Sequence, residues 1–191
     1  MPRLIAALGN PGLEYERTRH NIGWDILKFC DFYSDLNWKD KYKGLYASLD
    51  VSGDKVHFIK PMTFMNLSGE SVSAVARFFK VEVKDILVLQ DEIDLPFGTI
   101  AFKKGGGLAG HNGLRSIKEK IGSQDFLRLR LGVGRPEHGS VSSWVLSKYR
   151  GDDEIALDTY LKCAAGAINT YIEKGYDRAA NMYSRKNCLE I

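Results

Sequence analysis

Short apolar runs alternate along the chain with longer segments in which apolar residues recur every three or four positions. The run at residues 4–8 is stopped by Gly9, Pro11 and Gly12, which is the pattern of a buried strand that ends in a turn. The longer period predicts helices with one apolar face. The predicted strands are residues 4–8, 45–51, 55–60, 86–89, 99–103 and 126–133, and the predicted helices are residues 19–33, 69–80, 112–121 and 152–174.

Strands that alternate with helices predict an α/β fold: a central, twisted, mixed β-sheet flanked by helices, with further helices at the C-terminal end. Strand 126–133 alternates apolar and basic residues, so we expect one of its faces to contact solvent. No repeat, low-complexity tract or linker interrupts the 191 residues. Because domains typically hold ~100–200 residues, we expect residues 1–191 to form a single domain.

Composition excludes several classes of protein. Hydrophobic residues make up 44% and charged residues 27%, close to an average globular protein and far from a disordered one. A net charge of +3 excludes a strongly basic packaging protein. The three cysteines form no C-x-x-C pattern, so we expect no disulfide framework, no structural zinc and a cytoplasmic location. No apolar stretch is long enough for a signal peptide or for the ~20 residues that span a bilayer.

Charge is uneven along the chain. Residues 101–135 carry eight basic side chains against two acidic ones, and residues 82–94 carry five acidic side chains against one lysine. A basic segment is usually a solvated face, but the glycine cluster at residues 105–107 favours a phosphate-binding surface here. The basic residues are Lys103, Lys104, Arg115, Lys118, Lys120, Arg128, Arg130 and Arg135.

Known nucleotide and nucleophile motifs are incomplete. Residues 105–110 contain G-x-G-x-x-G, but a dinucleotide site also needs an acidic residue at the end of the next strand, and Asp125 precedes that strand. The phosphate-loop and G-x-S-x-G patterns are absent, and Cys30 falls on an apolar helix face. The glycines of this loop either let backbone N–H groups bind an anion or are present because the loop needs residues with positive φ angles. A hydrolase built from this chain would therefore activate water.

His20 is the best candidate for a general base. It falls in the first turn of a predicted helix, where the helix dipole disfavours protonation and keeps the imidazole neutral, as a base requires. His111 is the second candidate. A zinc site formed by His20, His111 and Asp91 is conceivable, but no pair has the sequence spacing of metal ligands, so we expect no metal.

Polar residues cluster where predicted strands end. Asn10 and Asp91 follow strands, and Asn66 and Asn112 stand near the starts of helices that follow strands. In α/β sheets such positions share one edge, where ligands bind. Each asparagine alone is explained as a turn or cap residue, but carboxamides together suit peptide carbonyls, ribose hydroxyls and a developing oxyanion. Beside them lie the apolar residues Met62, Phe64 and Met65, and the set predicts a cleft.

Five segments follow one another in the order and at the spacing of a known family. They are LGNPG at 8–12 with Tyr15 and residues 18–21, KPMTFMNLSG at 60–69, DEIDLP at 91–96, GGGLAGHNGL at 105–114, and a fifth segment at 126–136. With them the chain resembles the bacterial-type peptidyl-tRNA hydrolases from about residue 4 to residue 149. It departs from the family where Leu108-Ala109 replaces His-Gly, where Gln90 replaces a common His, and where residues 137–140 lack a lysine.

The resemblance implies a monomeric enzyme that cleaves the ester between a peptide and the 3′-terminal ribose of tRNA without metal or cofactor. It implies that His20 is the general base and that Asp91 orients the imidazole and stabilises the imidazolium. Asn10 and Asn66 would position the peptide end and the ester, and Asn112 the substrate or the water. The other implied substrate contacts are Tyr15, Phe64, Met65 and His111 along the cleft, and Lys103 and Arg130 at a phosphate of the tRNA end.

Two alternatives use the same residues differently. A non-catalytic RNA-binding protein on this fold is disfavoured because His20, Asp91 and the three cleft asparagines are all present. A small-molecule hydrolase with the same base would keep its activity when Lys103 and Arg130 are changed to glutamate. The first alternative is separated from the esterase by a hydrolysis assay, and the second by those charge reversals.

Overall fold

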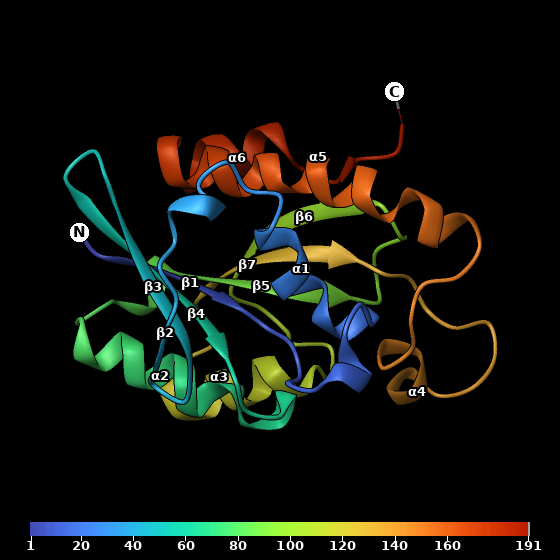
Figure 1. Ribbon diagram of the computed structural model, residues 1–191, viewed down its shortest axis with the longest axis horizontal. Coiled ribbons are helices and arrows are strands. Elements are labelled where there is room, and N and C mark those ends of the chain that lie inside the picture. Colours follow the sequence, from blue (N-terminus) through green and yellow to red (C-terminus); the bar gives the residue numbers. More distant parts are fainter. Residues whose placement is uncertain (191) are drawn as a thin grey trace.

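The computed structural model describes residues 1–190 and contains one eight-stranded mixed sheet with helices on both faces (Figure 1). The strand order is β2-β3-β4-β1-β5-β7-β6-β8. The strands are β1 Arg3–Ala7, β2 Lys39–Lys41, β3 Gly44–Val51, β4 Asp54–Pro61, β5 Ile86–Glu92, β6 Thr99–Lys104, β7 Leu127–Gly132 and β8 Lys186–Asn187. The α-helices are α1 Ile22–Leu27, α2 Ser68–Phe78, α3 Asn112–Ile121, α4 Val141–Val145, α5 Asp152–Lys174 and α6 Tyr176–Met182. The predicted α/β fold with a mixed sheet is confirmed.

The centre of the sheet is parallel and buried on both faces. Strands β4, β1, β5 and β7 run in one direction, so their carboxyl ends meet at one edge. In β1, Ile5 and Ala7 pack on the side of α1 and α5, while Leu4 and Ala6 pack on the side of α2 and α3. Figure 1 shows α5 above the sheet and α2 and α3 below it. This burial explains why β1 is a continuous apolar run rather than an alternating one.

The prediction of one continuous helix over residues 19–33 is wrong, because the structure has shorter elements there. Residues Arg19–Asn21 form a 3₁₀ turn, α1 covers only Ile22–Leu27, and a second 3₁₀ turn covers Tyr33–Asp35. Between the last two, the N–H groups of Phe29 and Cys30 donate to carbonyl groups three residues back instead of four. The apolar face is still buried against α5, because packing holds the side chains without a continuous helix. By contrast, helices 112–121 and 152–174 have the predicted bounds.

The cysteine prediction is also wrong. Cys163 on α5 and Cys188 beside β8 are paired as a disulfide, with Cα atoms 5.6 Å apart. The two residues meet because the chain after α6 returns to pair β8 with β6, a tertiary event that no local cysteine spacing signals. Cys30 is free and buried, and burial raises the pKa of its thiol. Within residues 1–190, no helix is both long enough and apolar enough to cross a membrane.

Candidate active site

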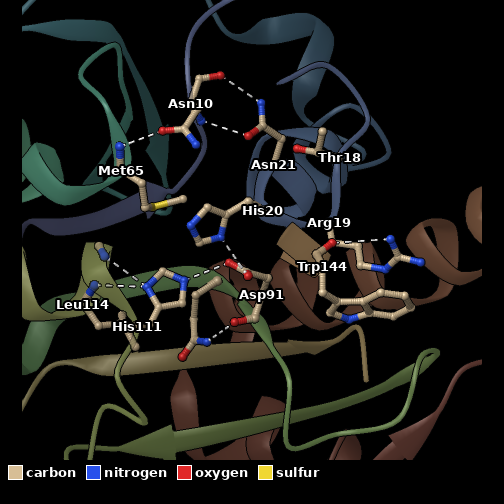
Figure 2. A network of polar contacts seen from close by, with 12 residues as sticks. Asn10, Thr18, Arg19, His20, Asn21, Met65, Asp91, His111, Leu114 and Trp144 are labelled. Carbon is tan, nitrogen blue, oxygen red and sulfur yellow. Dashed lines mark hydrogen bonds and ion pairs between the residues drawn. The ribbon is translucent and has the colours of Figure 1, made fainter. Parts of the chain in front are cut away.

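Asp91 lies at the centre of the carboxyl edge of the sheet. It is the next-to-last residue of β5 and is only 2% exposed. Each oxygen of its carboxylate is bonded to a different imidazole: Oδ2 to His20 Nδ1 and Oδ1 to His111 Nε2, both at 2.8 Å (Figure 2). The two histidines that sequence analysis ranked as base candidates therefore share one buried carboxylate.

His20 is held on its 3₁₀ turn by its neighbour Arg19. The Arg19 guanidinium donates to the carbonyl oxygens of Ser147 at 3.2 Å and Lys148 at 3.0 Å, and it stacks 3.4 Å from the centre of the Trp144 ring. Thr18 forms a single β-bridge with Lys148. Arg19 points away from the cleft while His20 points into it (Figure 2). The turn that carries His20 is thus fastened to the segment that follows α4.

His111 has a second set of partners. It is the N-cap residue of α3, and its Nδ1 accepts the backbone N–H groups of Gly113 at 3.1 Å and Leu114 at 3.3 Å. Those N–H groups are among the four that a helix leaves unpaired at its start. The ring consequently links the first turn of α3 to Asp91.

The electrostatics of the trio correct one prediction. Burial lowers the pKa of His20, but the charge of Asp91 and the hydrogen bond to it outweigh burial, so the pKa of His20 is raised. Burial alone would raise the pKa of Asp91, but the two imidazoles hold it well below its ordinary value. The expected lowering by a helix dipole fails because a carboxylate at hydrogen-bond distance dominates over a three-residue turn.

Asn10 is buried next to this trio. Its side-chain oxygen accepts the Met65 N–H at 2.7 Å, and its backbone forms two hydrogen bonds with the side chain of Asn21. No partner for its side-chain N–H₂ group is found within residues 1–190, and in Figure 2 the amide lies over the His20 side of the cleft. Asn10 therefore keeps a fixed orientation and two free donors.

The cleft itself consists of two adjoining cavities that share His20, Asn112, Ser142 and Val145. Asp91 and His111 line one cavity, and Asn10 and Asn66 line the other. The predicted rim of asparagines, one carboxylate and two imidazoles is thus assembled. Phe64 and Met65 line the second cavity with them, as predicted.

One wall of the cleft was missed by sequence analysis. It is formed by α4, which contributes Val141, Ser142 and Val145. Val141 and Val145 are spaced one helical turn apart, which could have indicated a helix here. The segment is too short and too rich in serine for that spacing to predict one. Of the cleft-lining residues that the structure describes, none is Tyr15, Lys103 or Arg130.

Lys103 and Arg130 lie on the adjacent strands β6 and β7, outside the cleft. The side chain of Arg130 is 3.7 Å from the carboxylate of Glu92, so part of its charge is already balanced. We expected the basic face of strand 126–133 to contact solvent, and this prediction is wrong for Arg128, which is only 1% exposed. Its guanidinium donates to the carbonyl oxygens of Gly105 at 2.9 Å and Gly107 at 3.0 Å and so holds the glycine loop.

The trio is also a cluster of metal-binding residue types. One possible ligand atom from each of His20, Asp91 and His111 lies within 4.8 Å of the others. The imidazole nitrogens that face the carboxylate are already hydrogen-bonded to it, so a metal ion would have to displace both contacts. The absence of a metal requirement stays a prediction.

A mixed sheet whose parallel strands end at a cleft with a histidine–carboxylate pair has the architecture of an α/β enzyme, and a pair of this kind is suited to acid–base chemistry. The sequence model of the family described as peptidyl-tRNA hydrolase matches residues 4–190, and the chain therefore belongs to this family. The predicted resemblance is confirmed.

Individual relatives match nearly the whole chain. A peptidyl-tRNA hydrolase of Geotalea uraniireducens is 41% identical over 188 residues, 98% of this chain and 98% of that protein. One of Sulfurimonas denitrificans is 43% identical over 188 residues, 96% of this chain and 97% of that protein. The crystal structure of peptidyl-tRNA hydrolase from Acinetobacter baumannii superposes with a TM-score of 0.88 at 34% identity and covers 97% of this chain and 96% of that one.

Proposed function

We propose that this chain hydrolyses the ester that joins the peptide to the 3′-terminal ribose in peptidyl-tRNA, with His20 as the general base. Membership of the peptidyl-tRNA hydrolase family and relatives of that name at 36–43% identity support the activity. The observation that carries the mechanism is the 2.8 Å contact between His20 Nδ1 and Asp91 Oδ2 inside the cleft.

Proton transfer follows from this contact. His20 donates its Nδ1–H to Asp91, so the lone pair of Nε2 is free. Nε2 takes a proton from water as the water oxygen bonds to the ester carbonyl carbon. When the bond from that carbon to the ribose oxygen breaks, Nε2 returns the proton to the leaving oxygen. The products are a peptide carboxylic acid and a tRNA with a free ribose hydroxyl, and His20 ends neutral.

The remaining cleft groups would bind the substrate and the charge that develops on it. Asn10 offers its free amide donors to the peptide or the oxyanion, and Asn66 and Asn112 are exposed carboxamides on the same cleft. Phe64 and Met65 would contact the apolar part of the peptide. Tyr15 is half-buried and does not line the cleft, so we propose that it contributes only indirectly to binding of the peptide.

The tRNA end would be held outside the chemical cleft. Lys103 and Arg130 are half-buried cations on the paired strands β6 and β7, and the Lys103 side chain lies next to Gly106 of the glycine loop. Cations at this position would bind a phosphate near the 3′ end of tRNA and release its counterions. We also propose that the chain works in the cytoplasm as a monomer and that residues 1–191 are one domain, since one sheet spans the described chain.

The test is release of an N-acetyl-aminoacyl group from tRNA by wild type, His20→Ala and the control His138→Ala in EDTA. His138 is an exposed loop residue, so its variant keeps full activity. His20→Ala should lower kcat by about 10²–10⁴-fold with an unchanged circular dichroism spectrum. Wild-type turnover that ceases in EDTA would contradict the metal-free mechanism. If folded wild type binds tRNA but shows no turnover, the hydrolase proposal is wrong and the non-catalytic RNA-binding alternative takes its place.

A further inference from the structure

The proton on His111 is fixed in place by its two sets of partners. A nitrogen that accepts hydrogen bonds carries no proton, and Nδ1 accepts from the backbone of Gly113 and Leu114. The single proton of the neutral ring is therefore on Nε2, which faces Asp91 Oδ1 at 2.8 Å. The N-terminus of α3 thus selects one tautomer and turns His111 into an N–H donor to the carboxylate.

The consequence for Asp91 is that its charge is shared. Oδ1 accepts the N–H of His111 and Oδ2 accepts the N–H of His20, so each imidazole competes for the same buried charge. Within residues 1–190, no other side chain is hydrogen-bonded to this carboxylate. The negative charge of Asp91 that the His111 N–H stabilises is therefore less able to stabilise a protonated His20.

We infer that His111 is a positioning residue that holds Asp91 through a permanent N–H donor and limits how strongly the carboxylate acts on His20. The inference rests on the general-base role proposed for His20. It gives His111 a function that needs no contact with substrate.

Other charged groups around His20 do not replace this effect. From β5, Glu92 lies near the Arg130 guanidinium, and from the turn of His20 itself Arg19 is directed onto Trp144. The α4 side of the cavity presents Val141, Ser142 and Val145, none of which is charged. Beyond α4, the buried phenol of Tyr149 has a raised pKa and stays neutral. Asp91 and His111 are thus the groups that set the basicity of His20.

The two contacts of His111 can be separated by substitution. Asparagine is a favoured N-cap residue, so His111→Asn keeps an acceptor for the start of α3 but is too short to reach Asp91. Glutamine is long enough to donate an amide N–H to Asp91 but is a poor cap. His138→Asn, in an exposed loop, is the matched control.

The first measurement is long-range ¹H–¹⁵N NMR of the histidine rings, which reports the tautomer and the titration of each ring without any substrate. In wild type we expect the neutral His111 ring to carry its proton on Nε2. In His111→Asn the titration of His20 should move to higher pH by about one unit, the size expected for one lost charge-assisted hydrogen bond. His111→Gln and His138→Asn should leave it near the wild-type position.

The second measurement is kcat/KM against pH. Since the base must be neutral, the acid limb should move up with the His20 titration in His111→Asn, giving about tenfold lower activity well below the limb and near-normal activity above it. In His111→Gln the limb stays and the melting temperature falls by about 2–4 °C through loss of the cap.

The outcomes separate this inference from the proposed function. A neutral His111 ring protonated on Nδ1, an unmoved or downward His20 titration in His111→Asn, or an equal loss at every pH would overturn the inference, even in an enzyme that hydrolyses peptidyl-tRNA. Failure of wild type to hydrolyse would contradict the function, while the NMR result would still decide whether His111 controls His20.

Discussion

The two walls of the cleft are held in different ways. On the strand side, Asn10 and Asp91 are buried and fixed by hydrogen bonds from Met65, His20 and His111. On the other side, α4 has only five residues and is held through Trp144, whose ring stacks on Arg19 and whose indole N–H donates to the Gly134 carbonyl at 2.8 Å. The groups that we propose to move protons are therefore fixed by several hydrogen bonds each, whereas Val141 and Val145 lie on a short helix that is held mainly at Trp144. Variants of the first wall should change kcat, and variants of the second should change KM.

Asp91→Asn should give the largest effect among variants that keep His20. The amide cannot accept both N–H groups or stabilise an imidazolium, so we expect kcat to fall about 10–100-fold. Asp91 raises the pKa of His20, so its removal lowers that pKa and moves the acid limb of the rate profile to lower pH. Asp94→Asn, which alters an exposed carboxylate bonded to Arg135, is the control. A limb that stays in place would contradict the pairing.

Lys103→Glu should act on binding alone. Reversal of one cation at the tRNA end should raise KM about tenfold at low salt and leave kcat nearly unchanged, and the effect should shrink as salt rises. Lys174→Glu, at the exposed end of α5, makes the same charge change away from the cleft. A loss that does not depend on salt would argue against a phosphate contact, and no loss at all would favour the small-molecule alternative.

Arg19→Lys should loosen the α4 wall. Lysine keeps the charge but loses the planar fork and the stack on Trp144. We expect KM to rise about threefold to tenfold with little change in kcat, and faster proteolysis within residues 136–143. Arg17→Lys, an exposed neighbour bonded to Asp158, is the control. A fall in kcat at constant KM would show instead that Arg19 acts through His20, and the two walls would not be separable.

Ala109→Gly should have the smallest effect. Ala109 stands in the glycine loop with a φ of 50°, a left-handed conformation that costs an alanine roughly 1–2 kcal/mol. Glycine adopts this conformation without that cost, but it makes the unfolded chain more flexible, which offsets about 0.5–1 kcal/mol of the gain in stability. The melting temperature should therefore rise by about 1–3 °C. Gly107→Ala, at a loop position without positive φ and with open space for a methyl group, should instead stabilise the protein slightly, because alanine lowers the entropy of the unfolded chain. Destabilisation by Ala109→Gly would mean that the alanine methyl group makes a packing contact.

Local pattern was sufficient for much of the fold. The bounds of α3 and α5 follow from helical periodicity with a capping or glycine stop, and the central strands follow from apolar runs ended by turns. The cleft asparagines were found because the ends of parallel strands must share an edge. The choice of His20 and Asp91 as a pair came from the family resemblance, and their contact is consistent with it.

The remaining features depend on residues distant in sequence. The burial of Arg128 needs the carbonyl groups of the glycine loop, which an alternating strand pattern does not reveal. The direction of the shift in the pKa of His20 depends on a carboxylate 71 residues away. The pairing of Cys163 with Cys188 likewise depends on where the chain end returns. In each case tertiary placement outweighs the local rule.

The very short strands at both edges of the sheet also affect how the protein behaves at high concentration. An open sheet edge is a row of unpaired backbone groups onto which another chain can add. Here β2 has three residues, two of them lysines, and β8 has two residues, one of them a lysine. These two strands are therefore too short and too charged to template a further strand themselves. Within residues 1–190, residues 47–51 of β3 and 101–104 of β6 have no strand on their outer side, so an added chain would have to pair there, and the second of these segments carries Lys103 and Lys104.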